Sequence, residues 1–474
     1  MAYKAYVTTL KNVRPHPNAD RMKLADCFGN TVCVGLDAVE GEIVLYFPCD
    51  GQLSVEYCEQ NNLVRKKDDA GNNIGGYLDP DKRNVKAINL RGEKSDGLVM
   101  PLSSIVYTEV NLDDLNVGDT FDVLNGHEIC QKYIPCSNHR MYSGGGVSKN
   151  RKYKTPIAPL FVEHVDTEQL AYNLSAFKAC DEIEITLKMH GTSQRTGYLP
   201  VIQPNKVEYD AVWKYFVDLI TPIKSWKFKF KEKFGKPVYD WGYVSGTRRT
   251  TLENYEGGYY GSNEFREKHS KFFEGKLWKG ETVYYEVVGF THTGAPIMAD
   301  GNNEKLGKEF VKQYGKTTTF SYGCHQNGWN DKDGGYNSGH NEPQSDMYVY
   351  RMTMTKEDGD VVEYTPDFMR YRCEQMGVKT VPVFWRGDIP EYPATADDDT
   401  VSPGDWAMKL AEKYYDGPDP IGKTHIREGV VVRIVNRPSF KAYKHKNYNF
   451  KVLEGIIKEL AEAPDMEEAQ EIME

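Results

Sequence analysis

The chain has 474 residues, of which 39% are hydrophobic and 27% charged, and its formal net charge is -10. This length exceeds what one hydrophobic core usually organises, so we expect at least two domains in an ordinary soluble globular protein. The chain contains no run of about 18 uncharged apolar residues, and its start lacks the apolar core of a signal peptide, so we expect no membrane segment and a cytoplasmic location.

The cysteines argue against two further classes of protein, whereas the net charge leaves the class open. The nine cysteines include no C-x-x-C pair and cannot all pair, so the sequence favours neither a zinc ribbon nor a secreted disulfide framework. Phosphate binding needs only local positive surface. Carboxylates concentrate at 397–399 and 465–474, whereas residues 224–236 carry six lysines and one glutamate. The negative total therefore decides little about nucleic-acid partners.

Residues 1 to about 140 read as short β-rich runs separated by turn residues. Strand-like segments at 31–34, 42–47 and 85–90 favour a small β-barrel. The polar, glycine-rich segment 142–155 is typical of a domain boundary, which we place near residue 155.

The remainder of the chain predicts an α+β domain. It alternates β-branched runs with less regular stretches and contains a helical candidate over 168–177. Composition predicts a surface loop over 322–345 and a loop-rich insertion over 386–420 that includes a helix near 406–415. An amphipathic helix is expected from 452 onward. The β-branched runs lie at 183–187, 283–288, 347–350 and 430–434.

Lys188 is the first candidate catalytic residue, because it ends an apolar run and is followed closely by His190 and Gly191. A lysine amine, with a reference pKa of about 10.4, needs neighbouring cations or desolvation to act as a nucleophile. Lys444 and Lys446 would project to one face of a strand, where they could supply the neighbouring positive charge and hold a phosphate. An isolated lysine is more often a solvated surface residue, but the apolar run and the glycine favour the functional interpretation.

Glu286 and Glu428 are carboxylates in apolar, strand-like surroundings, where an unpaired charge is costly. A ribose hydroxyl suits one of them, and a hydrated Mg²⁺ suits the other. The alternative is a structural ion pair with Arg427 or Arg433.

Tyr350 alternates with apolar residues and could stack on a purine, although such a tyrosine is more often part of a core. Arg248 and Arg249 follow a tight turn and suit phosphate oxygens, although a solvated charge pair is the commoner role. Basic and aromatic residues interleave over 224–231, which fits either a nucleic-acid surface or an amphipathic strand.

In this order, the motifs resemble those of the ATP-dependent RNA ligases of the covalent nucleotidyltransferase superfamily, over nearly the whole chain. The resemblance assigns motif I to the segment 188–191 in its RNA-ligase form, with histidine where DNA ligases and capping enzymes have aspartate. Leu187 and Ser193 depart from the residues frequent in these enzymes. The remaining assignments are Arg248 or Arg249 (motif Ia), Glu286 (motif III), Tyr350 (motif IIIa), Glu428 (motif IV), and Lys444 with Lys446 (motif V).

The N-terminal segments 15–24, 44–48 and 90–98 resemble bacterial and phage RNA ligases that carry an OB-like domain before the ligase domain. The first segment is also similar to the OB domain of tRNA-binding proteins. The resemblance implies an OB-like nucleic-acid-binding β-barrel over 1–155. It also implies an ATP-grasp-like nucleotidyltransferase domain with antiparallel sheets over 156–474, with insertions near 200–240 and 320–345.

The resemblance implies joining of RNA 3′-hydroxyl and 5′-phosphate ends through AMP carried on Lys188, with Mg²⁺ or Mn²⁺ as the metal. ATP would be contacted by Leu187, His190, Gly191, Arg248, Arg249, Glu286, Tyr350 and Glu428, and the metal by Glu286 and Glu428. The substrate would be a nicked duplex or a cleaved tRNA, and the protein would act as a monomer, in a phage-infected bacterium if the phage likeness holds.

Two alternatives remain. A DNA ligase or a capping enzyme is disfavoured because these place an OB domain after motif V, whereas about 28 residues follow Lys446. A non-catalytic tRNA- or RNA-binding protein is disfavoured because such a protein has no physical need for Lys188, Glu428 and two further lysines together.

Overall fold

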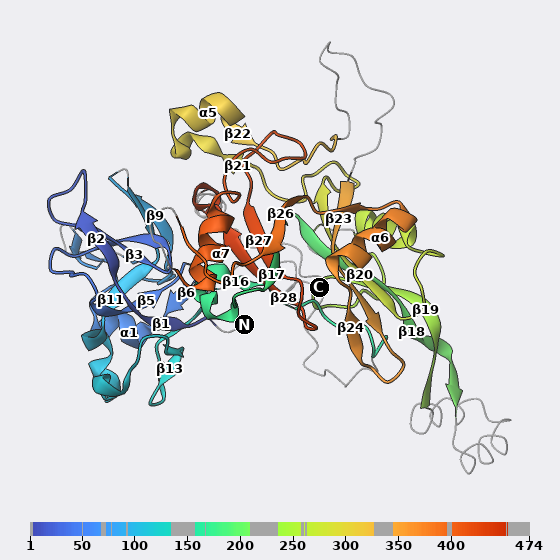
Figure 1. Ribbon diagram of the computed structural model, residues 1–474, viewed down its shortest axis with the longest axis horizontal. Helices are drawn as coiled ribbons and strands as arrows, with labels where there is room; N and C mark the ends of the chain where they lie inside the picture. The colour runs from blue at the N-terminus through green and yellow to red at the C-terminus, as the bar shows by residue number, and fades with distance from the viewer. Residues whose placement is uncertain are drawn as a thin grey trace.

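The computed structural model describes residues 3–49, 51–67, 73–76, 78–91, 93–133, 157–165, 167–208, 236–256, 260, 263–326, 345–395, 401–451 and 453. These residues form an α+β protein with mainly antiparallel sheets, as predicted. The N-terminal strands lie at one end of the molecule, and the long strands β18 (Thr192–Glu208) and β19 (Lys236–Gly246) lie at the other (Figure 1). None of the helices in these residues is long and apolar enough to cross a membrane.

Two small sheets organise the N-terminal region. One has four antiparallel strands in the order β11-β5-β1-β12, and the other has three in the order β2-β3-β4. Leu45 and Phe47 of β5 lie in the core of the first sheet, whereas Val44 and Tyr46 face the core of the second. Alternate residues of one strand therefore join both cores.

The elements of this region are β1 (Ala5–Thr9), β2 (Lys11–Pro15), β3 (Lys23–Cys27), β4 (Asn30–Val34), β5 (Ile43–Phe47), β6 (Gly51–Leu53), α1 (Val55–Gln60), β7 (Lys66–Lys67), β8 (Asn73–Gly75), β9 (Ala87–Leu90), β10 (Glu93–Asp96), β11 (Leu98–Pro101), η1 (Leu102–Thr108), η2 (Leu112–Asp114), β12 (Thr120–Phe121), β13 (Val123–Leu124), β14 (His127–Glu128) and β15 (Cys130–Lys132). The strands predicted at 31–34, 42–47 and 85–90 correspond to β4, β5 and β9.

The closed barrel predicted for this region is not confirmed, because strand pairings among the described residues leave the two sheets separate. β2 follows β1 after one residue but joins the other sheet. Asn12 has a φ of 53°, and the register of β2 shifts between Lys11 and Arg14. Lys11 already pairs with Asp26 of β3, so the chain changes sheets at Leu10, and the left-handed residue and the register shift then bend β2 within the second sheet.

A five-stranded sheet in the order β16-β28-β27-β17-β26 carries Lys188, the first residue of the first predicted motif. All its pairings are antiparallel except the short parallel pair of β16 with β28. Ile183 and Ile185 pack on one side with Ala407 and Met408 of helix α7. The elements are β16 (Glu168–Gln169), β17 (Glu182–Lys188), β26 (Val383–Asp388), α7 (Pro403–Glu412), β27 (Gly429–Ile434) and β28 (Lys441–Lys446).

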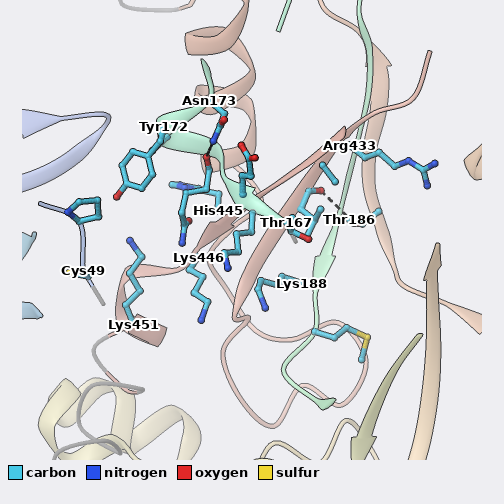
Figure 2. Close-up of a pocket in the computed structure, with 18 of the residues that line it drawn as sticks. Cys49, Thr167, Tyr172, Asn173, Thr186, Lys188, Arg433, His445, Lys446 and Lys451 are labelled. Atoms are coloured by element: carbon cyan, nitrogen blue, oxygen red, sulfur yellow. Dashed lines mark hydrogen bonds between the residues drawn. The ribbon is translucent and has the colours of Figure 1, made fainter. Parts of the chain in front are cut away.

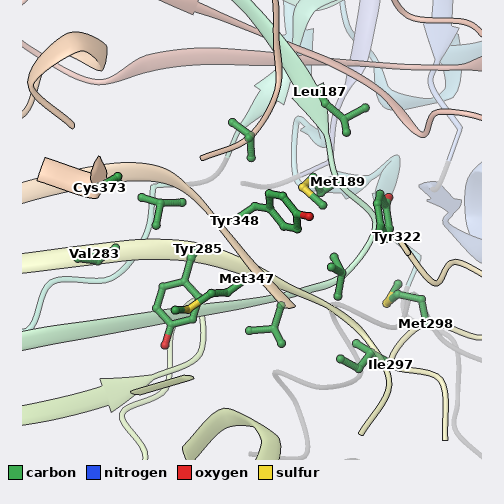
Figure 3. Close-up of a cluster of buried hydrophobic side chains, with 14 of the residues drawn as sticks. Leu187, Met189, Val283, Tyr285, Ile297, Met298, Tyr322, Met347, Tyr348 and Cys373 are labelled. Atoms are coloured by element: carbon green, nitrogen blue, oxygen red, sulfur yellow. The ribbon is translucent and has the colours of Figure 1, made fainter. Parts of the chain in front are cut away.

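A second sheet runs in the order β19-β18-β20-β23-β24, with β25 paired to β23. The largest hydrophobic cluster joins it to the first sheet, since the cluster contains Leu187 of β17 together with Val283 and Tyr285 of β20 (Figure 3). The other elements are η3 (Leu170–Tyr172), η4 (Leu174–Ala176), α4 (Glu264–Phe272), β20 (Glu281–Gly289), β21 (Gly301–Asn302), η5 (Asn303–Leu306), α5 (Lys308–Tyr314), β22 (Thr317–Thr318), β23 (Ser345–Thr355), β24 (Val361–Glu363), α6 (Pro366–Met376) and β25 (Lys379–Thr380). The runs predicted at 183–187, 283–288, 347–350 and 430–434 are strands β17, β20, β23 and β27.

The helix predictions were less accurate. The segment 168–177 is not one helix but β16 followed by the two short turns η3 and η4. Asn173 separates the turns, and its side-chain amide donates to the Gln169 carbonyl at 2.7 Å, a local bond that competes with helix formation. The helix predicted near 406–415 begins earlier, at Pro403, because Ser402 caps it by accepting from the Asp405 amide.

Several predicted segments lie outside the described residues. These are the domain boundary near 155, most of the insertions near 200–240 and 320–345, the basic aromatic segment 224–231, and nearly all of the C-terminal helix from 452.

A buried ion pair between α6 and β20 predicts a large effect on stability. The Arg372 guanidinium donates from Nε and Nη2 to the two carboxylate oxygens of Glu281, each at 2.8 Å, and the side chains are 3% and 0% exposed. Arg372→Leu removes the cation and leaves the carboxylate buried, so we expect the free energy of unfolding in urea to fall by about 3–5 kcal/mol. The control Lys379→Ala removes an exposed pair with Asp346 and should cost less than about 1 kcal/mol. Equal losses would contradict the prediction.

Candidate active site

Strand β17 presents Lys188 to a cavity. Glu184, Thr186 and Lys188 all line this cavity, whereas Ile183 and Ile185 pack into a hydrophobic cluster. This is the alternation of a strand buried on one face. The lysine is thus carried by a strand with packed neighbours, and its side chain is 13% exposed.

Glu428 is the centre of a charged cluster beside Lys188. Its Oε1 lies 2.8 Å from Lys188 Nζ and 3.2 Å from Lys446 Nζ, and its Oε2 lies 3.8 Å from His190 Nδ1. The strands cause this convergence, since Gly429 of β27 pairs with Lys188 on one side and Lys446 on the other. A carboxylate that is 2% exposed therefore holds two lysine amines together.

Gly429 makes the close approach of these strands possible. Its φ is 150°, and a Cβ built there would lie 2.2 Å from the His445 carbonyl oxygen and 2.7 Å from Lys446 Cα. The backbone atoms that it would meet cannot move without shifting β28. A side chain at this position would therefore displace Lys446 relative to Lys188.

For this reason we expect Gly429→Ala to lower both stability and any reaction that needs the lysine pair. The free energy of unfolding in urea should fall by about 2–3 kcal/mol, because the left-handed backbone and the backbone clash add. Gly242→Ala on β19 is the control, since its Cβ would meet nothing closer than Val201 Cγ2 at 3.4 Å. Similar losses in the two variants would show that the contact with β28 is unimportant.

The cavity has a volume of about 920 Å³ and lies between the N-terminal region and the two sheets. Its described lining includes eleven lysine and arginine residues and four acidic residues, a formal excess of seven positive charges in a chain of net charge -10. Figure 2 shows Lys188, Lys446 and Lys451 along this cavity, with Tyr172 nearby. A cavity of this charge concentrates anions such as phosphates.

The structure brings most of the predicted site residues to this one cavity. Glu286 on β20 and Tyr350 on β23 line it, and burial raises the pKa of Tyr350, so its hydroxyl stays protonated. That hydroxyl is hydrogen bonded to the Ser193 hydroxyl at 2.9 Å, and the ring centroid lies 5.1 Å from that of His164. The predicted residues that line the cavity are Leu187, Lys188, Arg248, Arg249, Glu286, Tyr350, Lys444 and Lys446.

Three predicted residues lie behind the cavity wall and are not among its described lining residues: His190, Gly191 and Glu428. The His190 ring packs edge-on between Phe320 and Phe450, with centroids 4.7 and 4.8 Å away. A Cβ at Gly191 would lie 2.5 Å from the Val287 carbonyl oxygen, so the glycine permits a close approach of chains. Of the three, Glu428 contacts Lys188 directly, and His190 lies 3.8 Å from the same carboxylate.

The alternative partners proposed for the two glutamates are engaged elsewhere. Arg433 lies 3.3 Å from Glu363 and donates to the Tyr364 carbonyl at 2.8 Å. Arg427 donates to backbone carbonyl oxygens, including that of Tyr414 at 2.7 Å. A simple ion pair with either arginine therefore does not explain the buried carboxylates.

Sequence reasoning missed residues that have no recognisable motif. Arg266 on α4 is fully buried and donates to the Ser193 carbonyl at 2.9 Å and to Thr192 Oγ1 at 2.7 Å, which holds the strand after Lys188. Lys451, which lines the cavity, forms an ion pair with Asp96 of the N-terminal region. No local pattern in the sequence distinguishes either residue from an ordinary surface cation.

The two carboxylates predicted to bind the metal can be compared with what Mg²⁺ requires. Mg²⁺ accepts one or two carboxylates when phosphates and waters complete its shell. Glu286 fits, because its carboxylate is on the cavity wall. Glu428 fits less well, because two lysines converge on it, and within the described residues no cluster of three histidine, cysteine or acidic side chains could hold a metal unaided. The metal role of Glu428 stays a prediction.

Comparison with known proteins finds similar folds among solved structures. No protein-family model and no curated protein matches the sequence. Among solved structures, an RNA ligase from Naegleria gruberi with pyrophosphate matches with a TM-score of 0.51 and 14% identity, over 96% of this chain and 98% of that one. A mutant of that ligase with AMP and Mn matches with a TM-score of 0.51 and 14% identity, over 94% and 98%. Another mutant, with ATP and Mn, matches with a TM-score of 0.50 and 14% identity, over 94% and 98%.

These similarities and the sheet arrangement define a class of fold: the chain has the fold of the RNA ligase structures over nearly its whole length. At 14% identity the likeness concerns the fold alone, and the chemistry depends on the residues of this chain.

Proposed function

We propose that the protein is an ATP-dependent RNA ligase that joins 3′-hydroxyl and 5′-phosphate ends through a lysyl-AMP enzyme and an adenylylated RNA. The observation that carries this proposal is the cluster of Lys188, Lys446 and Glu428 at the wall of a positively charged cavity. The likeness of the fold to RNA ligase structures supports it.

In the first step, Lys188 Nζ releases its ammonium proton to solvent, attacks the α-phosphorus of ATP, and gives a second proton to solvent as the phosphoramidate forms. A nitrogen–phosphorus bond forms, the bond from the α-phosphorus to the bridging oxygen breaks, and pyrophosphate leaves with the bonding electrons. Lys444 and Lys446 are placed to neutralise negative charge that develops on the α-phosphate. Glu428 holds Lys446 and Lys188 within reach of the same phosphate.

Other wall residues have proposed roles in holding the nucleotide. Tyr350 offers an aromatic face for the adenine, and Arg248 and Arg249 offer donors for phosphate oxygens. Glu286 would bind either the ribose or a divalent ion, Mg²⁺ or Mn²⁺. When bound, such an ion supplies charge neutralisation at the phosphates.

In the second step the AMP passes to the 5′-phosphate of an RNA end, and in the third a 3′-hydroxyl displaces AMP to seal the strand. We propose a nicked duplex or a cleaved tRNA in the cytoplasm as the substrate. The two parts would be residues 1–155, as an OB-like RNA-binding domain, and residues 156–474, as the adenylyltransferase domain. The excess of positive charge in the cavity supports an RNA partner.

The first test is covalent labelling. The purified protein is incubated with α-labelled ATP or GTP and Mg²⁺ or Mn²⁺, and label retained on the denatured chain is measured. The proposal requires label from ATP alone. Label from GTP would indicate capping chemistry, and no label from either would indicate the non-catalytic alternative.

A sealing assay then tests the RNA substrate. Splinted and unsplinted 5′-phosphorylated RNA are offered to the protein with ATP, and joined product is measured. A nick-sealing enzyme should prefer the splinted ends by about tenfold or more, since the duplex holds the reacting ends together. A preference for unsplinted ends would point to loop repair instead.

A further inference from the structure

The segment 320–326, at the start of the insertion expected near 320–345, contacts the turn that follows Lys188. Its Tyr322 is 3% exposed and has a φ of 49°, an uncommon backbone conformation for an aromatic residue. A bulky side chain held in a left-handed conformation needs strong support from its surroundings. Its contacts identify what it supports.

On one side, Tyr322 contacts the turn that follows the nucleophile. The His190 backbone amide donates to the Tyr322 hydroxyl at 2.7 Å. Met189 belongs to the same hydrophobic cluster, and Figure 3 shows Tyr322 beside the segment that carries Leu187 and Met189. The hydroxyl thus satisfies a buried backbone donor two residues after Lys188.

On the other side, Tyr322 contacts the segment that leads to Glu428. Its ring packs edge-on against His425, with centroids 4.7 Å apart. The Nδ1–H of His425 donates to the Ile426 carbonyl at 2.8 Å, and the His425 carbonyl accepts from the Asp419 amide at 2.9 Å. Burial lowers the pKa of His425 to about 4, so this ring is neutral near pH 7.

We propose that Tyr322 is a positioning residue for the nucleophile: it braces the turn after Lys188 against the segment before Glu428. The distance between the lysine amine and the carboxylate depends on both segments, and Tyr322 contacts both. The expected effect on labelling from ATP rests on the proposed function. The expected effect on the position of Lys188 does not.

The test compares two single-atom deletions in one hydrophobic cluster. Tyr322→Phe removes the hydroxyl that accepts from His190. Tyr285→Phe is the matched control, because Tyr285 is a fully buried tyrosine whose hydroxyl is bonded to Thr196 at 2.9 Å. For each variant, the single-turnover rate of labelling from ATP is measured against ATP concentration, and rates are corrected for the folded fraction.

We expect Tyr322→Phe to slow labelling at saturating ATP by about tenfold or more, because small displacements of a reacting group have large effects on rate. The half-saturating ATP concentration should change by less than about twofold, since Tyr322 does not line the cavity. Tyr285→Phe should stay within about twofold in both quantities. Equal rates in the two variants would overturn the proposal.

A second readout needs no nucleotide chemistry. Folded protein is treated with limiting acetic anhydride, and acetylation of Lys188 is mapped by mass spectrometry relative to exposed Lys379. We expect the relative reactivity of Lys188 to change by about threefold or more in Tyr322→Phe and to be unchanged in Tyr285→Phe. If the wild-type protein takes no label from ATP, the proposed function fails, and this comparison alone decides whether Tyr322 positions Lys188.

Discussion

Lys188→Arg is expected to abolish covalent labelling from ATP, a loss of at least about a thousandfold, while the folded protein remains intact. A guanidinium keeps the positive charge and can still pair with Glu428, but it cannot lose a proton to become a nucleophile. Labelling on the denatured chain measures the first property, and urea unfolding measures the second.

The control for this prediction is Lys379→Arg, which makes the same substitution at an exposed lysine. Labelling of this variant should stay within about twofold of the wild-type level. A Lys188→Arg variant that still accepts label would place the nucleophile at another lysine. In that case peptide mapping of the labelled chain would identify it, and the assignment of the site would be wrong.

Glu428→Gln is expected to have the second largest effect. The substitution removes the carboxylate on which Lys188 and Lys446 converge, so the two partly buried amines repel each other and move apart. We expect labelling at saturating ATP to slow by about a hundredfold, and the free energy of unfolding to fall by about 3 kcal/mol. The rate is measured over ranges of ATP and Mn²⁺ concentration.

Metal dependence distinguishes the two roles considered for Glu428. If it positions the lysines, raised Mn²⁺ will not restore the rate. Glu286→Gln is the comparison, because Glu286 is on the cavity wall and should shift the Mn²⁺ concentration needed for half-maximal rate. Recovery of Glu428→Gln at high Mn²⁺ would contradict the positioning role and support direct metal binding.

The strands of the candidate site could be predicted from the sequence because their signals are local. The apolar run before Lys188 and the alternation at Lys444 and Lys446 are visible in a few residues, and the structure confirms strands β17 and β28 at these places. The order of the motifs also predicted that distant segments would meet. Tyr350 and Glu286 do lie on the cavity that Lys188 lines.

Other features could not be predicted because they depend on contacts between distant segments. Whether His190 and Glu428 face the nucleotide or support Lys188 from behind depends on the depth of the cavity wall, which no residue pattern encodes. Arg266 and Tyr322 act through buried hydrogen bonds to backbone atoms about 70 and 130 positions away. The closed barrel was expected from the strand-like segments and from the resemblance, but the chain passes from one sheet to another at Leu10, and no local pattern marks that change.

The contrast between the acidic chain and its cationic cavity has a consequence for how a polyanion finds the protein. Although the chain has a net charge of -10, the described lining of one cavity carries an excess of seven positive charges, so the local field at this cavity attracts phosphate groups. The reacting ends of an RNA strand therefore gain attraction where they reach this cavity, whether they lie in a nick or in a cleaved loop. The local charge thus draws RNA to the place where its ends would react, and salt weakens that attraction.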